Sequence, residues 1–376
     1  MLALALGGLI AGLAWWVFRR RAGSSIDDRI SVRDAIRGAR RMPLIATMVD
    51  ALIQIFAVAV GGSLGREGAP RQAGAALAGE LAHRFGLNER ERRILLASGA
   101  GAGLAAVYNV PLAGAAFTFE VLLVGVGVGI AADALLAAVT SSFVATAIAA
   151  GILGTRPVYA LPGTSHLSLW LCVGAVVIGV IGGIAGQLLV RTTRIARTRS
   201  QRGNTRRRTV LTITLAFTAL GIVAIPAPDL LGNGKALAQL AFDGSFTAQA
   251  ALALAVLKPA ATALCLRAGA IGGILTPSFA TGATLGLAFA GFTHASSEVR
   301  VALVLAGAAA VTCAAQNAPI TAVLFACELT AGYGAVGIGR GVAVLLAVLA
   351  AMVTMRASRY QAKVAAVTKK PIGQSV

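Results

Sequence analysis

The chain has 376 residues, of which 57% are hydrophobic and 12% charged, and its mean hydropathy is +0.81. Ordinary soluble domains are about 45–50% apolar and about 25% charged, so this composition excludes that class and indicates an integral membrane protein. The formal net charge is +19, but the basic residues stand in blocks beside apolar segments without interleaved aromatics, which argues against a nucleic-acid-binding surface.

The first apolar segment, Leu2 to Phe18, runs directly into the basic block Arg19 to Arg21. A signal peptide has the opposite order, basic before apolar, so we expect a retained membrane span that enters the cytoplasm. The basic blocks Arg191 to Arg208 and Arg356 to Lys370 are expected on the same side, because short basic loops beside spans stay cytoplasmic. The compact chain suggests a multi-pass protein of the bacterial inner (plasma) membrane.

Further apolar windows are long enough for a hydrocarbon layer, which needs about 20 helical residues. Their residues are mainly alanine, leucine and glycine without strict alternation, which predicts helices rather than the strands of a membrane barrel. The windows are Leu44–Leu64, Leu95–Val128, Leu167–Val190, Val210–Ala227 and Val336–Val353.

Charge interrupts one of these windows in the sequence GREGAP, Gly65 to Pro70. Ionisable residues inside a membrane segment are costly and are candidates for function, here Arg66, Glu67 and the nearby Arg71. Glycine lets the chain bend and proline suits the first turn of a helix, so we predict a break followed by a helix over Arg71–Leu81.

An internal repeat relates two parts of the chain. The segment YNVPLAGAAFTFE, Tyr108–Glu120, matches QNAPITAVLFACE, Gln316–Glu328, with asparagine, proline, phenylalanine and glutamate in register. Such repeats are typical of transporters whose two halves have inverted topology and bind substrate where the halves meet. The span Leu167–Val190 has no counterpart before Met1, so we expect the first half to lack its first span.

Both repeats carry a helix break at an equivalent position. The second break is GAIGGILTP, before a predicted helix over Ser278–Phe292, and a third candidate is AGSSIDD, Ala22–Asp28. A helix beginning inside the membrane presents unpaired N–H groups and the positive end of its dipole, which together favour a small anion. The carboxylate of Glu67 can occupy such a site when no ion does.

In their order along the chain, GSSID (Gly23–Asp27), GREGAP, GGILTP (Gly272–Pro277) and the two N-x-P helices resemble the CLC family of chloride channels and proton-coupled chloride transporters. The resemblance covers Met1 to about Tyr360. It implies that Glu67 is the external gate and that Gly65, Arg66, Glu67 and Gly68 belong to the anion-binding site. It further implies anion contacts from the Ser24 hydroxyl, the backbone N–H groups of Ile274 and Leu275, and Tyr360.

The sequence departs from the family pattern at several positions. The family usually has proline where GSSID carries Asp27, the proline of GREGAP comes one residue late, and Leu275 replaces an aromatic residue. Transporters of the family often have an inner glutamate after the position of Glu120. That position is Val121 here, which argues against proton coupling.

Other readings of these residues are open. Glu67 could form a structural ion pair with Arg66 or Arg71, Ser24 could be a helix N-cap, and Tyr360 could be an interfacial anchor.

Glu120 and Glu328 occupy equivalent repeat positions and are expected to share a structural role, such as capping a neighbouring helix. Small residues in Gly99–Gly103 and Ala306–Ala310 predict close helix packing. The segment Leu230–Leu240 predicts a short helix with Lys235 facing water, and the charged residues between Glu80 and Arg93 predict a solvated loop.

Cysteines 172, 265, 313 and 327 and histidines 83, 166 and 294 are isolated, so the sequence predicts no metal, no cofactor and no catalytic triad. We therefore expect no enzyme, and an intramembrane hydrolase is only a remote alternative. The favoured function is transport of chloride or a similar anion, as a channel or an H⁺/Cl⁻ exchanger. The alternatives are fluoride or nitrate transport, or a truncated, non-conducting membrane partner.

The predicted fold is an all-α integral membrane protein with two inverted-topology helical repeats and broken, partially spanning helices. The first half is expected over residues 1–166 and the second over 167–356, with a terminal helix and short basic tail over 357–376. Expected partners are the anion, protons as a candidate second substrate, the lipid bilayer and, by resemblance, a second copy of the chain in a homodimer.

Overall fold

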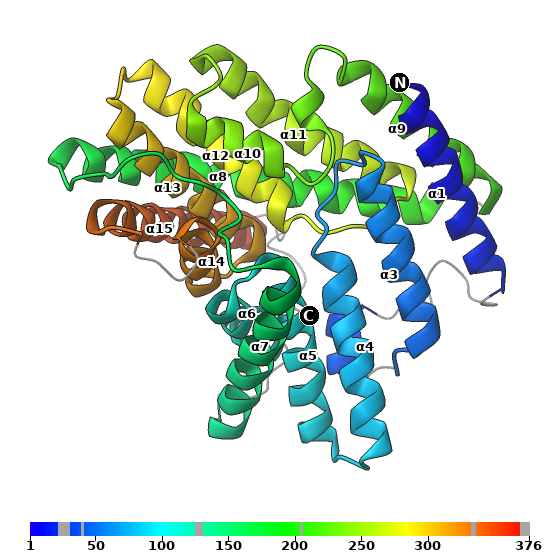
Figure 1. Cartoon of the computed structure of the whole chain (residues 1–376). Coiled ribbons are helices and arrows are strands. Elements are labelled where there is room, and N and C mark those ends of the chain that lie inside the picture. Colours follow the sequence, from blue (N-terminus) through cyan, green and yellow to red (C-terminus); the bar gives the residue numbers. More distant parts are fainter. Residues whose placement is uncertain (22–30, 39–40, 125–130, 204–205, 332–335, 369–376) are drawn as a thin grey trace, which may run out of the picture.

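The computed structural model describes residues 1–21, 31–38, 41–124, 131–203, 206–331 and 336–368, which are mostly helical (Figure 1). Within these ranges, five helices are long and apolar enough to cross a membrane by length and composition. They are Ala132–Leu153, Leu169–Ser200, Ala248–Ala268, Ser297–Gln316 and Ile338–Gln361. The prediction of an all-helical membrane protein is confirmed.

The first half of the chain forms α1 (Leu2–Arg21), α2 (Val32–Ile36), α3 (Leu44–Ala59), α4 (Gly68–Arg84), α5 (Glu89–Tyr108), α6 (Pro111–Phe117), the π-helical turn η2 (Thr118–Leu123) and α7 (Ala132–Leu153). The predicted window Leu95–Val128 is not one continuous helix. It breaks because Asn109 is left-handed, with φ of 57°, and Pro111 then opens a new helix.

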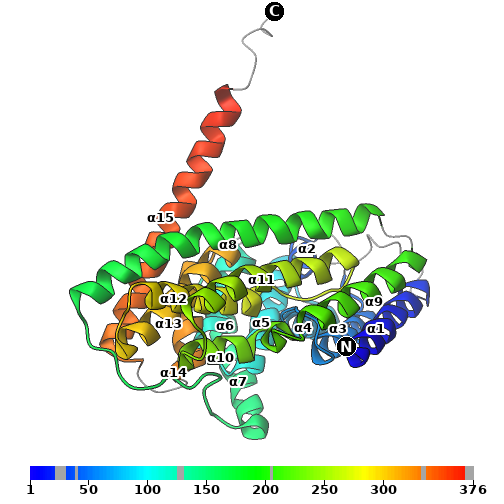
Figure 2. The ribbon, with the colours of Figure 1, turned by 90° about the horizontal axis from the view of Figure 1, so that it is seen from above.

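The second half forms α8 (Leu169–Gly203), α9 (Arg206–Val223), the 3₁₀ turn η4 (Pro228–Leu230), α10 (Lys235–Asp243), α11 (Ala248–Ala268), α12 (Leu275–Phe292), α13 (Ser297–Gln316), α14 (Pro319–Ala331) and α15 (Ile338–Thr368). The short helix expected after Leu230 is α10, and Lys235 at its start is exposed, as predicted. Figure 2 shows α8 crossing the molecule and the C-terminal part of α15 extending beyond the other helices.

The two helices that follow the breaks begin earlier than the sequence predicts. Helix α4 starts at Gly68 rather than Arg71, and α12 starts at Leu275 rather than Ser278. In both helices the proline is the third residue. The first-turn N–H groups of a helix have no intrahelical partner, so proline is accommodated there without breaking a hydrogen bond.

Glycine allows each broken helix to pack closely on the helix that follows it. A Cβ atom on Gly99 of α5 would overlap the carbonyl oxygen of Gly74 on α4. In the second half, a Cβ on Gly307 of α13 would meet the carbonyl oxygen of Gly282 on α12 in the same way. The predicted close packing around Gly99–Gly103 and Ala306–Ala310 is confirmed.

The repeated glutamates cap helices across the boundary between the halves. The Glu120 carboxylate accepts hydrogen bonds from the backbone N–H groups of Ile320 (2.9 Å) and Thr321 (2.6 Å) at the start of α14. The Glu328 carboxylate accepts from Leu112 (3.0 Å) and Ala113 (2.7 Å) at the start of α6. The predicted shared capping role is confirmed, and each cap places a negative charge at a helix N-terminus.

A buried lysine ties the second half to the first. Lys258 of α11 is 0% exposed, and its Nζ donates to the carbonyl oxygens of Leu230 and Gly232, each at 2.8 Å. The backbone N–H of Gly232 in turn donates to the carbonyl oxygen of Gly61, just after α3 (3.0 Å). The lysine therefore holds the turn that contacts the chain leading into the first break.

We expect Lys258→Met to lower the thermal unfolding midpoint of the detergent-purified protein. Methionine fills a similar volume but leaves two buried carbonyl groups without their donor, a loss of about 1–3 kcal/mol for each unsatisfied group. Lys235→Met, at an exposed position, is the matched control and should leave the midpoint nearly unchanged. Equal midpoints for both variants would contradict the role of Lys258.

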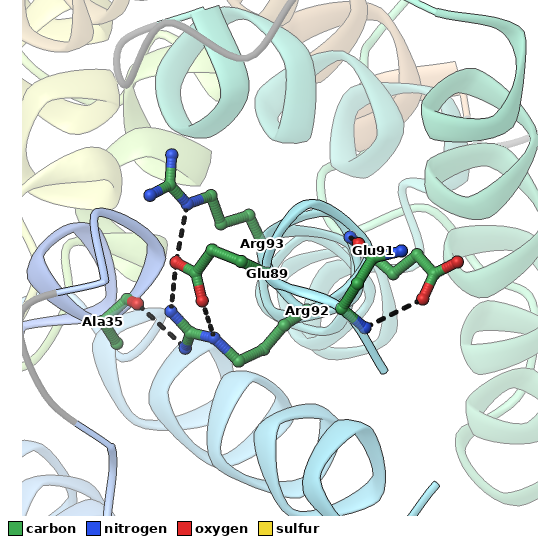
Figure 3. Close-up of polar contacts among 6 residues, drawn as sticks. Ala35, Glu89, Glu91, Arg92 and Arg93 are labelled. Carbon is green, nitrogen blue, oxygen red and sulfur yellow. Dashed lines mark hydrogen bonds and ion pairs between the residues drawn. The ribbon is translucent and has the colours of Figure 1, made fainter. Parts of the chain in front are cut away.

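The charged residues from Glu80 to Arg93, predicted to form a loop, lie at the end of α4 and the start of α5. Helix α5 starts here because it is capped by Asn88, whose side chain accepts from the Glu91 backbone N–H (3.0 Å), while the Glu91 carboxylate accepts from the Asn88 N–H (3.0 Å). Beside this cap, Glu89 bonds Arg92 and Arg93, and Arg92 also reaches the Ala35 carbonyl oxygen of α2 (Figure 3). The arginine hydrogen bonds, first from Arg92 and then from Arg93, lower the pKa of Glu89 to about 2.

We expect the stabilisation from Glu89 to be present at neutral pH and lost in acid. A carboxylate whose pKa is lowered by folding stabilises the protein above its ordinary pKa, near 4.5, and this contribution disappears as the pH falls towards about 2. Because Glu89 is 53% exposed, solvent screening keeps the contribution below about 1 kcal/mol. Unfolding midpoints of the wild type and Glu89→Gln should differ slightly at pH 7 and converge in acid, and a gap independent of pH would contradict this.

Candidate functional site

The two helix breaks are joined to each other by backbone hydrogen bonds. The Gly65 N–H donates to the Gly273 carbonyl oxygen (2.8 Å), and the Gly273 N–H donates to the Gly65 carbonyl oxygen (2.9 Å). Backbone groups freed inside a membrane need a protein, water or ligand partner. Each break supplies that partner for the other, which fixes the starts of α4 and α12 side by side.

The Glu67 side chain lies at the N-terminus of α12. Its Oε1 accepts a hydrogen bond from the Leu275 backbone N–H (2.7 Å), and its Oε2 accepts from the Thr276 hydroxyl (3.1 Å) and the Tyr108 hydroxyl (3.3 Å). Glu67 is 0% exposed. Leu275 is the first residue of α12, so the carboxylate takes the place that the helix dipole offers to a negative charge.

Two glycines make room for this carboxylate. A Cβ atom added at Gly65 or Gly273 would overlap the Glu67 carboxylate oxygens. Hence the glycines of the breaks do more than permit a turn, because they leave the space beside the α12 N-terminus in which an anionic group fits.

Neither neighbouring arginine pairs with Glu67 among the contacts of the described residues. The Arg66 guanidinium lies 4.9 Å from the centre of the Tyr108 ring and donates to the Val107 carbonyl oxygen (3.3 Å). The Arg71 guanidinium lies 5.0 Å from the centre of the Phe117 ring. Both cations rest on aromatic faces, so the carboxylate is held by neutral donors rather than by the ion pair considered from sequence.

A cavity of about 390 Å³ adjoins Glu67. Gln54 and Gln72 line it, and the Gln54 amide donates to Gln72 Oε1 (2.6 Å) and to the buried Asp50 carboxylate of α3 (2.9 Å). Asp50 also accepts from the indole N–H of Trp15 (3.0 Å). The buried Asp50 carboxyl therefore contacts Gln54, which lines the cavity. Its hydrogen bonds to Gln54 and Trp15 offset the cost of burying a polar group.

A second cavity, of about 1420 Å³, lies between α8, α13 and α15. Several basic side chains line it, namely Arg33, Arg191, Arg194 and Arg359. Val121 lines both cavities, so the position directly after Glu120 contributes no carboxylate to either of them. Within the described ranges, no cluster of three or more histidine, cysteine, aspartate or glutamate side chains could hold a metal.

The structure brings most of the predicted site residues together. Gly65, Glu67 and Leu275 meet through the hydrogen bonds above, Gly68 and Ile274 line the cavity beside Glu67, and Arg66 lies next to them over Tyr108. Ser24 falls outside the described residues.

Tyr360 is not at this site in the structure. It is 70% exposed on α15, which continues without a break through its position, and it is not among the residues that line the cavity beside Glu67. The structure therefore does not place Tyr360 among the residues around Glu67, where the family resemblance predicts it.

Sequence reasoning missed Tyr108, Thr276 and Asp50. In the sequence Tyr108 stands out only as the first residue of a repeat motif, whose partner residue, Gln316, lines the cavity beside Glu67. Thr276 precedes the proline of the second break, where the first break has Ala69. Asp50 is a lone acid in an apolar window, which is itself a signal of function or of a specific partner.

Several known proteins are similar to this chain. Residues 7–356 match the family model described as voltage gated chloride channel. A putative chloride channel protein ClcB-like of Ralstonia nicotianae is 31% identical over 340 residues, 87% of this chain and 76% of that protein. The H(+)/Cl(-) exchange transporter ClcA of Vibrio parahaemolyticus is 30% identical over 349 residues, 88% of this chain and 72% of its own.

The fold also resembles a solved structure. A slow cyanobacterial Cl⁻/H⁺ antiporter superposes with a TM-score of 0.82 at 24% identity, covering 95% of this chain and 83% of that one. At this identity the likeness concerns the fold, and it supports the arrangement of broken helices described above.

We expect Gly273→Ala to displace the Glu67 carboxylate from the Leu275 N–H, because the added methyl group would occupy the position of Oε1. Cryo-electron microscopy of the variant should show the Glu67 side chain in a different rotamer. Gly151→Ala is the matched control, since a Cβ there meets open space. A variant structure that keeps the hydrogen bond to Leu275 would contradict this account.

Proposed function

Because the chain belongs to the voltage-gated chloride channel family, we propose that it moves chloride or a similar small anion across a membrane along a path that Glu67 closes. The observation that carries this proposal is the hydrogen bond from the Leu275 N–H to the Glu67 carboxylate at 2.7 Å. The carboxylate sits where a mobile anion would bind, so anion and gate compete for one site.

The competition gives the gate a physical mechanism. An ionised Glu67 satisfies the N-terminus of α12 and excludes a second negative charge from it. Protonation neutralises the carboxylate and weakens its hold, so the side chain can leave and the anion can enter. Gly65, Arg66, Gly68 and Ile274 form the surroundings of this site.

The basic residues around the larger cavity support an anion path. Arg191, Arg194 and Arg359 are exposed along its wall, which also contains one acid, Glu120. A cleft with an excess of positive charge raises the local concentration of anions. These arginines belong to blocks expected on the cytoplasmic side. We propose that the cavity collects anions from the cytoplasm and leads towards Glu67.

Channel and exchanger mechanisms differ in their need for a proton path. The relatives include proteins named as a chloride channel and as an H(+)/Cl(-) exchange transporter. Val121 supplies no carboxylate, and the Glu120 carboxylate beside it is bound by the backbone N–H groups at the start of α14. We therefore expect anion movement without tight proton coupling. Fluoride or nitrate are alternative substrates, and a non-conducting partner protein is the alternative from another class.

The setting of the protein is also proposed. We expect a multi-pass protein of a bacterial plasma membrane, acting in transport rather than as an enzyme. Its first half is expected over residues 1–166, its second half over 167–356 and a terminal segment over 357–376. A homodimer is expected from the family. Exposed apolar side chains on α7, among them Leu136 (65%) and Ile152 (79%), are available for lipid or for a second copy.

We expect Glu67→Gln to abolish the pH dependence of chloride flux while flux itself persists. Glutamine keeps the size of the side chain but cannot ionise, so the gate loses its proton-sensitive state. The measurement uses proteoliposomes with chloride and pH electrodes and competing fluoride and nitrate. Glu298→Gln, an exposed change at the start of α13, is the control.

Three outcomes of this assay would redirect the proposal. Unchanged pH dependence in Glu67→Gln would remove the gate role. Proton movement driven by a chloride gradient would establish exchange. A folded wild-type protein that moves no anion would favour the non-conducting partner.

A further inference from the structure

We infer that Tyr108 and Thr276 are anion ligands, whose hydroxyl groups coordinate the transported ion at the start of α12 when Glu67 leaves. This inference deepens the proposed function and depends on it. The hydroxyl contacts expected from family resemblance were those of Ser24 and Tyr360. In the structure, two hydroxyls from other elements, α5 and α12, converge on the same oxygen of the gate.

The present contacts of Glu67 define the donor set. Leu275 donates its N–H to Oε1, while the Thr276 and Tyr108 hydroxyls reach Oε2 at 3.1 and 3.3 Å. All of these residues are at most 2% exposed. A carboxylate is itself an anion, so an ion that replaces it inherits three donors aimed at one small volume.

An empty site would be costly. With Glu67 removed, the Leu275 N–H and both hydroxyls would lose their acceptor in a buried region. The Tyr108 and Thr276 oxygens lie 3.3 Å apart, but a mutual hydrogen bond uses the proton of only one of them. The remaining donors can be satisfied by an anion, and the Arg66 cation over the Tyr108 ring favours a negative ligand over a neutral one.

Both hydroxyls are held in position by packing. The Tyr108 ring meets Phe325 of α14 edge to face, with centroids 5.5 Å apart, and the left-handed Asn109 ends α5 directly after it. Thr276 lies in the first turn of α12, next to Pro277. Donors fixed before the ligand arrives cost little entropy to organise when it binds.

The test measures chloride binding to purified protein carrying Glu67→Ala, by titration calorimetry in chloride-free buffer. Adding Tyr108→Phe or Thr276→Val should weaken binding about tenfold each, the usual effect of losing a hydrogen bond to a charged partner. Thr276→Ser keeps the hydroxyl and should bind like the parent. Tyr159→Phe and Thr281→Val, at buried positions outside the Glu67 contacts, are the matched controls and should also bind like the parent.

The outcomes separate this inference from the proposed function. Unchanged affinity in both hydroxyl variants, with binding intact in the parent, would overturn the inference alone. Absence of chloride binding in the parent, together with absence of flux in the wild type, would overturn the proposed function as well. If Thr276→Val does not fold, Tyr108→Phe decides the inference, and bromide anomalous density within hydrogen-bond distance of the Tyr108 and Thr276 hydroxyls in a Glu67→Ala crystal would support it independently.

Discussion

The paired hydrogen bonds between Gly65 and Gly273 join two interrupted helices where neither could satisfy its own backbone. Everything at the site follows from this junction. It sets the first turn of α12 beside the residue that precedes α4, so that Glu67 reaches the Leu275 N–H without leaving its own helix start. A side chain larger than hydrogen at either glycine would fill the space that the carboxylate uses. Both hydrogen bonds are needed, because the hydrocarbon core of a membrane holds no water that could replace a missing backbone partner.

The two halves share the features that position the broken helices, but they differ in the residues that each break contributes to the site. Both repeats have a broken helix with proline in its third position, a following helix packed through glycine, and an asparagine in the left-handed region. The break of the first half supplies an acid, whereas that of the second supplies backbone and hydroxyl donors. Two copies of one unit have therefore become complementary: the first carries the Glu67 carboxylate, and the second carries the Leu275 and Thr276 donors that bind it.

Much of this arrangement could be predicted from the sequence, because it depends on local chemistry. Glycine and proline mark the breaks, an acid in an apolar window marks Glu67, and the repeat predicts the caps of Glu120 and Glu328. The contacts of Tyr108 and Thr276 could not be predicted, since they depend on how α5 and α12 approach each other across 168 residues. The place of Tyr360 was wrong for a related reason: spacing along the chain does not reveal whether a helix turns back or continues outward.

The exchange of caps between Glu120 and Glu328 bears on how the protein is made. The beginning of α6 is completed by a residue of α14, and the beginning of α14 by a residue of η2. During synthesis, the start of α6 therefore stays without its cap until Glu328, 215 residues after Ala113, has been translated. A chain whose synthesis stops midway therefore lacks the carboxylate that completes the start of α6.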